Sequence, residues 1–189
     1  NSIFFVVLMF GIGISMAVTP MVAAADGEGK TGKIGRLLNH GFVINTVSSF
    51  LLFLFILAVS PVLKLINQPQ EVVVLAIPYL LIITFSLLPF MFFQTYKQFI
   101  EGLSQTKQAM YITVIFNLLN IGLNWLLIYG NLGFPELGLN GAGWATLISR
   151  VFMAWALYIY VTKSNRYKNY IRGLRLKQIR LTIIKKMLG

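Results

Sequence analysis

The sequence of 189 residues contains no cysteine, a single histidine and only five acidic residues. Without cysteine the chain cannot form a disulfide, a thiolate metal site or a cysteine nucleophile. His40 has no second histidine to share a metal ion, so a solvated or hydrogen-bonded side chain is the expected interpretation, with proton coupling as the alternative. Neither H-E-x-x-H nor G-x-S-x-G occurs. The sequence therefore does not indicate an enzyme.

Charged side chains are scarce and apolar ones abundant. Charged residues make up 11% of the chain, where a soluble domain carries about 25%. Hydrophobic residues make up 57%, and the mean hydropathy is +0.77. The net charge of +11 could indicate nucleic-acid binding, but nine of the 16 basic residues lie between Lys163 and Lys186, and most others lie where apolar runs end. This is the pattern of a cytoplasmic membrane face, so we expect a membrane protein that binds no nucleic acid.

Five apolar runs predict an all-α, polytopic membrane helical bundle over residues 1–162. The first run is about 35 Å long as a helix, which exceeds the ~30 Å of a bilayer core. Residues 163–189 are predicted to be a basic cytoplasmic linker. The predicted spans are about 2–24, 38–66, 72–101, 108–130 and 143–162.

The basic residues also predict the orientation of these spans. Fourteen lie on one side of the predicted bundle, Lys64 alone lies on the other side, and Arg150 lies within a span. The loop after the first run and the linker are therefore expected to be cytoplasmic, and residues 134–143 external.

The first loop, Gly27 to Lys33, matches the pattern G-x-G-x-x-G and nearly matches a P-loop. No strand precedes it, and Ile34 stands where a P-loop needs a hydroxyl for magnesium. We expect a tight turn with Lys30, Lys33 and Arg36 as membrane anchors, and no nucleotide site.

A polar stripe marks the fourth run. Thr113, Asn117, Asn120 and Asn124 are spaced i, i+4, i+7, i+11, so they share one face of a helix that is otherwise apolar. The stripe either packs against another helix or lines a cavity. Amide contacts between buried membrane helices stabilise by only ~0.6 kcal/mol on average, so the cavity is favoured.

Two further groups of polar residues are candidates for function. Thr146 and Arg150 share one face of the fifth run, where Arg150 is expected either to pair with helix carbonyls or an amide, or to contact substrate. The second group lies near the end of the third run, where the spacing i, i+4, i+7, i+11 recurs in Gln94, Gln98, Glu101 and Gln105. This face is either a helix end exposed to solvent or a gate to a cytoplasmic cavity. The same run contains Pro78 and Pro89, which predict bends.

Several short motifs resemble one family of transporters. The run Asn117-x-x-Asn120-x-x-x-Asn124, then Phe134-Pro135-Glu136-Leu137-Gly138 and Gly141-Ala142-Gly143-Trp144-Ala145-Thr146, resembles the fifth helix, external turn and sixth helix of the multidrug and toxic compound extrusion (MATE) family, in its NorM-like branch. Upstream, the segment from Phe93 to Thr106 is similar to the end of that family's fourth helix. The segment from Pro20 to Gly29 is similar to the turn after its second helix.

The resemblance implies that the chain is helices two to six of the N-terminal lobe of a two-lobe fold, lacking the first helix and the C-terminal lobe. It implies a multi-pass antiporter of the cell inner (plasma) membrane, and no cofactor besides a coupling ion. Such a protein exports organic cations or other lipophilic compounds in exchange for sodium ions or protons. The alternative is a lipid or polysaccharide flippase of the wider superfamily, which would be expected to line its cavity with more cations than Arg150.

The polar faces of these helices predict that the substrate or ion cavity is lined by Thr113, Asn117, Asn120, Asn124, Thr146 and Arg150. Gln94, Gln98 and Glu101 are the candidates for a cytoplasmic gate. In relatives that hold sodium in this lobe, Asn120, the position of Asn124 and Thr146 contribute. There the second position is an aspartate, and here it is Asn124. No firm metal site is predicted, because this departure argues against a complete ion site within the chain.

Overall fold

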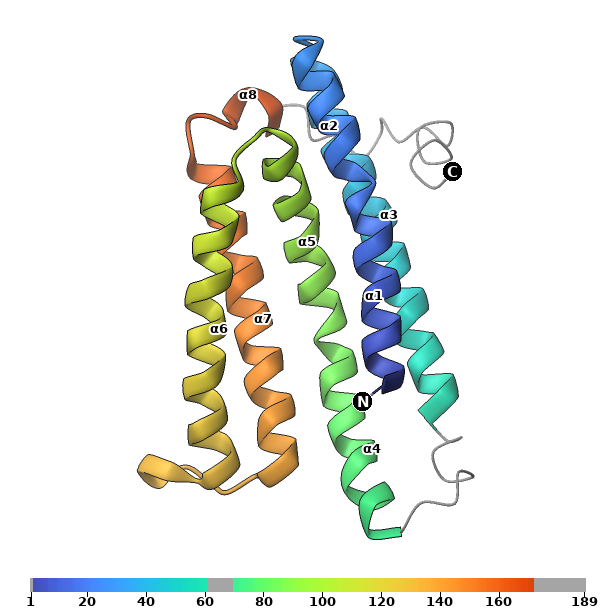
Figure 1. Cartoon of the computed structure of the whole chain (residues 1–189), viewed down its shortest axis with the longest axis vertical. Coiled ribbons are helices and arrows are strands. Elements are labelled where there is room, and N and C mark those ends of the chain that lie inside the picture. The colour runs from blue at the N-terminus through green and yellow to red at the C-terminus, as the bar shows by residue number, and fades with distance from the viewer. Residues whose placement is uncertain (1, 61–69, 172–189) are drawn as a thin grey trace.

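The computed structural model describes residues 2–60 and 70–171, and every regular element in these ranges is a helix. Five helical segments in them are long and apolar enough to cross a membrane. They run side by side along the long axis (Figure 1). In chain order the elements are α1 (Ser2–Met16), α2 (Val18–Gly27), α3 (Thr31–Val59), α4 (Gln70–Phe85), α5 (Leu87–Gly102), α6 (Thr106–Tyr129), the 3-10 turn η2 (Asn131–Gly133), α7 (Gly138–Lys163) and α8 (Lys168–Ile171).

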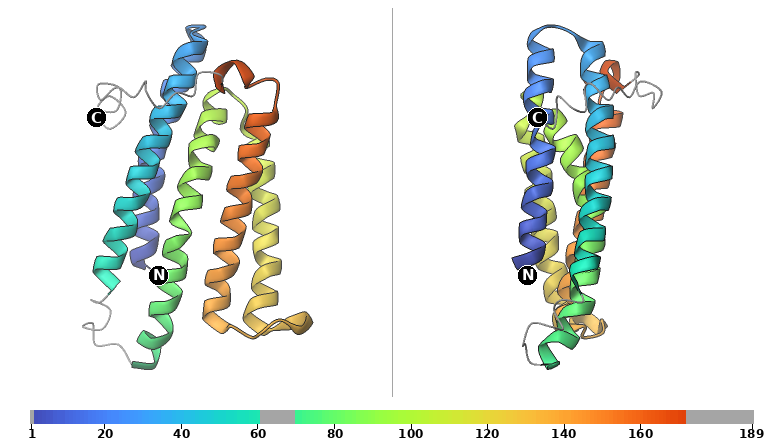
Figure 2. Two further views of the ribbon diagram at one scale, coloured as in Figure 1. Left: turned by 180° about the vertical axis from the view of Figure 1, so that it is seen from behind. Right: turned by 90° about the vertical axis from the view of Figure 1, so that its right-hand side faces the viewer.

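The helices form two layers. The stacked pair α1 and α2 lies in one layer with α6, while α3, α5 and α7 form the other (Figure 2). Helix α5 is central, because it packs against α2, α3 and α7, while α6 packs along α7. In the first layer α1 and α6 stand on opposite sides of α5 (Figure 1).

Two prolines divide spans that the sequence predicts as single helices. Pro20 lies four residues after the last residue of α1, Met16, and Pro89 lies four residues after the last residue of α4, Phe85. A proline ring collides with the carbonyl four residues earlier and cannot donate to it, so the helix breaks at that point. Pro78, in contrast, lies inside α4 without ending it.

The predicted span 38–66 is wrong at its start. α3 begins at Thr31, because Gly29 turns the chain with φ +66° and the Lys30 amide donates to the Ala25 carbonyl at 3.0 Å. The predicted loop is therefore a turn of three residues, Glu28 to Lys30, and Lys33 and Arg36 already belong to α3. The predicted end of that span, 61–66, lies outside the described residues.

The predicted start of the last span, residue 143, is also too late. α6 ends where Gly130 adopts φ +68°, but α7 already begins at Gly138 and contains Gly141 and Gly143. A Cβ at Gly141 would collide with the carbonyl oxygen of Leu127 on α6. Gly141 therefore allows α6 and α7 to approach closely, Gly143 packs against Tyr79 and Ile82 of α4, and neither glycine breaks the helix. The first predicted span, 2–24, ends later, at Gly27. The predicted spans 72–101 and 108–130 each agree with the observed helices to within two residues at both ends.

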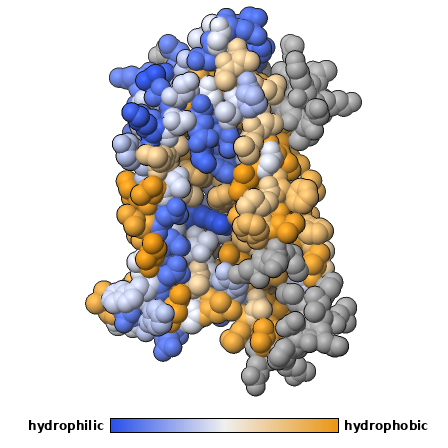
Figure 3. All heavy atoms as spheres, viewed as in Figure 1, coloured by the Kyte–Doolittle hydropathy of each residue, from blue (hydrophilic) through white to orange (hydrophobic). Residues whose placement is uncertain are grey.

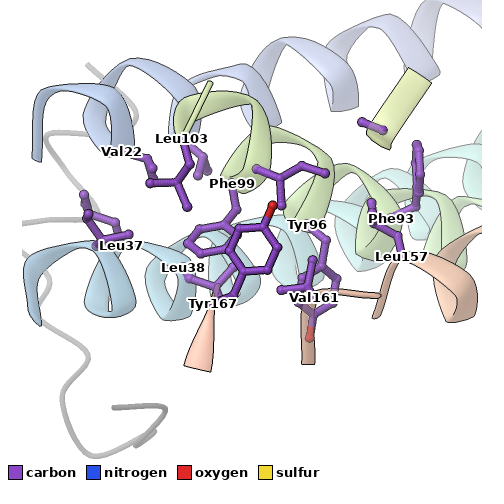
Figure 4. Close-up of a cluster of buried hydrophobic side chains, with 14 of the residues drawn as sticks. Val22, Leu37, Leu38, Phe93, Tyr96, Phe99, Leu103, Leu157, Val161 and Tyr167 are labelled. Carbon is purple, nitrogen blue, oxygen red and sulfur yellow. The ribbon is translucent and has the colours of Figure 1, made fainter. Parts of the chain in front are cut away.

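The largest hydrophobic core lies where α2, α3, α5 and α7 meet (Figure 4). Phe99 of α5 packs against Tyr167, which follows α7, with ring centroids 5.9 Å apart. The beginning of the predicted linker thus folds back onto the bundle, whereas residues 172–189 lie outside the described part. A second core joins α1, α3, α4 and the start of α5 through Phe4, Val7, Ile56, Leu80, Ile83 and Leu87.

Basic residues gather at one end of the bundle. The α2–α3 turn, the α5–α6 turn and α8 share the upper end in Figure 1, and the α6–α7 hairpin lies at the lower end. At the upper end Glu28 pairs with Lys30 and Lys33, each at 3.1 Å. The hairpin from Asn131 to Gly143 contains no Lys or Arg. This asymmetry of basic residues between the two ends predicts that the upper end is cytoplasmic.

Candidate functional site

A cavity of about 380 Å³ lies between α1, α5, α6 and α7. On the face seen in Figure 1, hydrophilic side chains gather along a hollow that is flanked by hydrophobic surface (Figure 3). Polar groups so placed within an apolar bundle are expected to face protein or a wet cavity, because contact with lipid is costly. The lining residues are Ile12, Phe90, Phe93, Gln94, Lys97, Thr113, Phe116, Asn117, Asn120, Thr146, Ser149, Arg150 and Met153.

Helix α6 supplies one wall through three of the four residues of the predicted stripe. Thr113, Asn117 and Asn120 line the cavity, but Asn124 does not. The Asn124 side-chain amide instead donates to Oδ1 of Asn120 at 3.0 Å. Asn124 lies ~6 Å further along the helix axis than Asn120, so it shares the face but is displaced along the helix toward the hairpin. It acts on the cavity only through Asn120.

Helix α7 supplies Thr146, Ser149, Arg150 and Met153, spaced i, i+3, i+4, i+7 on one face. The Thr146 hydroxyl donates to the Ala142 carbonyl at 2.9 Å, which leaves its oxygen able to accept. Ser149 is 5% exposed, and its hydroxyl has no partner among the described residues. A buried hydroxyl without a partner is costly, so a bound molecule or water is expected beside it.

Arg150 is held by three contacts. Its Nη1 donates to the Ser86 hydroxyl at 2.7 Å, and its guanidinium carbon lies 4.7 Å from the centroid of the Phe90 ring and 5.5 Å from that of Phe4. The sequence predicts pairing with a carbonyl or an amide, or contact with substrate. The observed partner is a hydroxyl at the break between α4 and α5, and the side chain also lines the cavity. Arg150 is thus paired as expected but with a hydroxyl, and contact with substrate stays a prediction.

The three gate candidates on α5 have different surroundings. Gln94 lines the cavity, is 3% exposed, and its Oε1 has no partner among the described residues. Gln98 is 5% exposed and accepts hydrogen bonds from the Thr19 hydroxyl on α2. Glu101 is half-buried and lies 3.8 Å from Lys97. Gln94 and Gln98 are therefore buried in the bundle and do not form a helix end exposed to bulk solvent. Gln98 also connects α5 to α2.

Sequence reasoning missed Ser86, Lys97 and Ser149. Spacing could have indicated two of them, because Lys97 follows Gln94 by three residues and Ser149 follows Thr146 by three. Ser86 could have been found only through the break that Pro89 causes. Apolar lining residues such as Phe90 and Met153 could not have been identified, because the sequence does not distinguish them from residues that face lipid.

The cavity wall offers neutral oxygen atoms and no carboxylate. The sodium candidates Asn120 and Thr146 both line it, whereas Asn124 contacts Asn120 from outside. Among the described residues, no three His, Cys, Asp or Glu side chains gather as a metal site. The charged groups on the wall are Arg150 and Lys97, which do not favour a bare cation.

A larger hollow of about 610 Å³ lies between α3, α5 and α7, and its lining includes Asn45, Ser49, Phe92, Thr95, Trp155 and Tyr158. In its lining, Asn45 Nδ2 donates to Thr95 Oγ1 at 2.7 Å and Thr95 donates to the Met91 carbonyl, while Oδ1 of Asn45 has no partner among the described residues. None of the predicted site residues reaches this hollow. The cavity at Arg150 is therefore the better candidate site.

Comparisons with known proteins agree on one family. A family model described as MatE matches residues 1–126. Over 168 residues the chain is 33% identical to a "Multidrug resistance protein NorM" of Photobacterium profundum, covering 89% of this chain and 37% of that protein. It is 36% identical to a "Multidrug resistance protein NorM" of Vibrio parahaemolyticus over 169 residues, covering 89% of this chain and 37% of that protein. The chain thus spans a little over a third of the length of these relatives.

A solved structure has the same arrangement of helices. It is described as the inward-facing conformation of a multidrug resistance MATE family transporter of the MOP superfamily. The two superpose with a TM-score of 0.80 at 21% identity, over 98% of this chain and 41% of the other. At this identity the likeness concerns the fold.

Proposed function

Because the chain belongs to the MatE family, and its described part is an all-α membrane bundle with the fold of a MATE transporter, we propose that the complete protein is a multidrug efflux transporter. The resemblance and the fold class predicted from the sequence are confirmed. In this proposal the chain is most of the N-terminal lobe, and the protein lies in the inner membrane. The chain matches 37% of the length of its NorM relatives, which leaves room for a second lobe in the complete protein.

The observation that carries the proposal is the position of Thr113, Asn117 and Asn120. They line a cavity of about 380 Å³, and that volume is within the range of small-molecule sites. Transporters place such sites near the middle of the membrane, beside the interface of two pseudo-symmetric halves. The cavity would hold a lipophilic compound by its aromatic walls and orient it by its amides.

Coupling to sodium ions or protons belongs to the same proposal, with no other cofactor and no catalytic activity. The oxygen atoms of Asn120 and Thr146 could contribute to an ion site, but a carboxylate would have to come from outside the described residues. A lipid or polysaccharide flippase remains the alternative. The two basic residues on the wall are few for phosphate headgroups, and Lys97 is already near Glu101.

The experiment is efflux of ethidium from cells that express the full-length transporter, compared with cells carrying the empty vector. Energised export should lower ethidium accumulation. In membrane vesicles an imposed sodium gradient and an imposed pH gradient, applied separately, identify the coupling ion. Equal accumulation in both strains at matched expression would contradict the proposal, and movement of lipid without ethidium would favour the flippase.

A further inference from the structure

Arg150 carries a positive charge that no carboxylate among the described residues balances. The described ion pairs join Lys30, Lys33 and Lys97 to Glu28 or Glu101, and none includes Arg150. A guanidinium has five N–H donors, and the described residues accept from it through the Ser86 hydroxyl alone. The rings of Phe4 and Phe90 stabilise the charge but are not conventional hydrogen-bond acceptors. Several N–H groups therefore remain for a ligand.

The surroundings of Arg150 fix how a ligand could approach. Ser86 lies on the α4–α5 break, and Phe90 lies one turn further along α5, so both hold the guanidinium from the α5 side. The side chain also lines the cavity, which Asn117 and Asn120 bound from the α6 side. A group entering the cavity thus meets a positioned cation and amide donors together.

The unpaired Ser149 hydroxyl gives independent support for a ligand because it can donate to a carboxylate, whereas Oε1 of Gln94 can only accept, from water or from a donor elsewhere on the compound. The Ser149 hydroxyl and the Gln94 Oε1 are buried without partners among the described residues, and both residues line the same cavity. Buried polar atoms without partners are rare in folded proteins and call for water, an ion or a ligand.

We propose that Arg150 makes this cavity a site for the carboxylate group of the carried compound. This inference rests on the proposed function, because it names the chemical class that the same cavity takes. A guanidinium and a carboxylate are complementary planar groups that form charge-assisted hydrogen bonds. A single unpaired cation matches one carboxylate, whereas a phosphate monoester carries more charge than it would balance. The favoured compounds are amphoteric, with an apolar body against Phe90, Phe93 and Phe116.

The test uses two dyes that differ in this one group. A rhodamine with a free benzoate and its methyl ester share the same cationic ring system, and only the first carries a carboxylate. Their affinities for the purified full-length transporter are measured by fluorescence anisotropy, so the assay does not depend on transport. Arg150→Gln should weaken binding of the carboxylate dye ~10-fold and that of the ester less than twofold.

Two further variants control the comparison. Arg166→Gln makes the same chemical change at an exposed residue outside the cavity, and it should alter neither affinity. Arg150→Lys keeps the charge but loses the planar donor pair, and it should weaken the carboxylate dye about threefold. It also provides the test if Arg150→Gln does not fold.

The outcomes separate this inference from the proposed function. Failure of the carboxylate dye to bind the parent protein, or equal weakening of both dyes by Arg150→Gln, overturns the carboxylate site. If ethidium is exported in either of these cases, the efflux proposal still stands. If the carboxylate dye binds through Arg150 but no compound is exported, the efflux proposal fails alone.

Discussion

Arg150 on α7 donates to the hydroxyl of Ser86 at 2.7 Å, at the residue that separates α4 from α5. The Ser86 hydroxyl itself donates to the Ile83 carbonyl at 2.6 Å, so it accepts from the guanidinium and cannot turn away. Pro89 causes the break that brings Ser86 to this position. A backbone irregularity in one span thus positions the charged side chain of another.

Ser86→Ala should destabilise the transporter, because it removes the hydrogen-bond acceptor of a charged group inside the bundle. The expected loss is about 1–3 kcal/mol, seen as a lower melting temperature of the full-length protein in detergent. Ser60→Ala is the matched control, because its hydroxyl also donates to the carbonyl three residues earlier, here Leu57, without receiving an arginine. A decrease no larger than that of the control would mean that the Arg150–Ser86 contact does not stabilise the fold.

Gly141→Ala should separate α6 from α7. A Cβ at this position meets the Leu127 carbonyl oxygen, which also accepts from the Leu137 amide at 3.0 Å. We expect a loss of folded yield and a destabilisation of about 1–3 kcal/mol, typical of overpacking. Gly122→Ala in α6 is the control, since nothing lies within 4 Å of its Cβ, and it should be neutral or slightly stabilising. Equal stability of both variants would contradict the close approach.

The orientation can be tested with single cysteines, since these 189 residues contain none. Glu136 in the α6–α7 hairpin and Thr31 at the start of α3 are both exposed, at opposite ends of the bundle. An impermeant thiol reagent should label Glu136→Cys in intact cells, and Thr31→Cys only after permeabilisation. The reverse pattern would invert the topology.

Much of the fold could be predicted, because periodicity and hydropathy directly report how a helix meets lipid. The five spans, their order and the shared face of Thr113, Asn117 and Asn120 follow from this. The start of α3 could not be placed, because the loop residues Gly32 to Arg36 are compatible with either a turn or a first helical turn. The start of α7 was missed because Gly141 allows close packing, a tertiary effect that in sequence looks the same as a helix breaker.

The site was predictable only where its residues are polar. Asn124 shares the stripe but lies outside the cavity, because periodicity gives the face of a helix and not the length of the cavity along it. Ser86 depends on a proline three residues later, and Phe90 reads as lipid-facing until the partner helix is known. Spacing could not decide whether Arg150 pairs with another side chain or contacts substrate. In the structure it pairs with Ser86 and also lines the cavity.

The central claim is that the α6 stripe serves transport and does not merely hold the bundle together. Asn120→Ala removes an amide that lines the cavity and that orients Asn124. Thr162→Ala on α7 is the control, because its hydroxyl also makes a local helix bond, to the Tyr158 carbonyl at 2.7 Å, but lies outside the cavity.

The most direct measurement is ethidium efflux by the full-length Asn120→Ala and Thr162→Ala variants, normalised to the amount of folded protein. The expected result is ~10-fold slower efflux for Asn120→Ala, which corresponds to ~1.4 kcal/mol, with folded yield and the control unchanged. Efflux at the parental rate, or loss of Asn120→Ala at the level of folding, would contradict the claim.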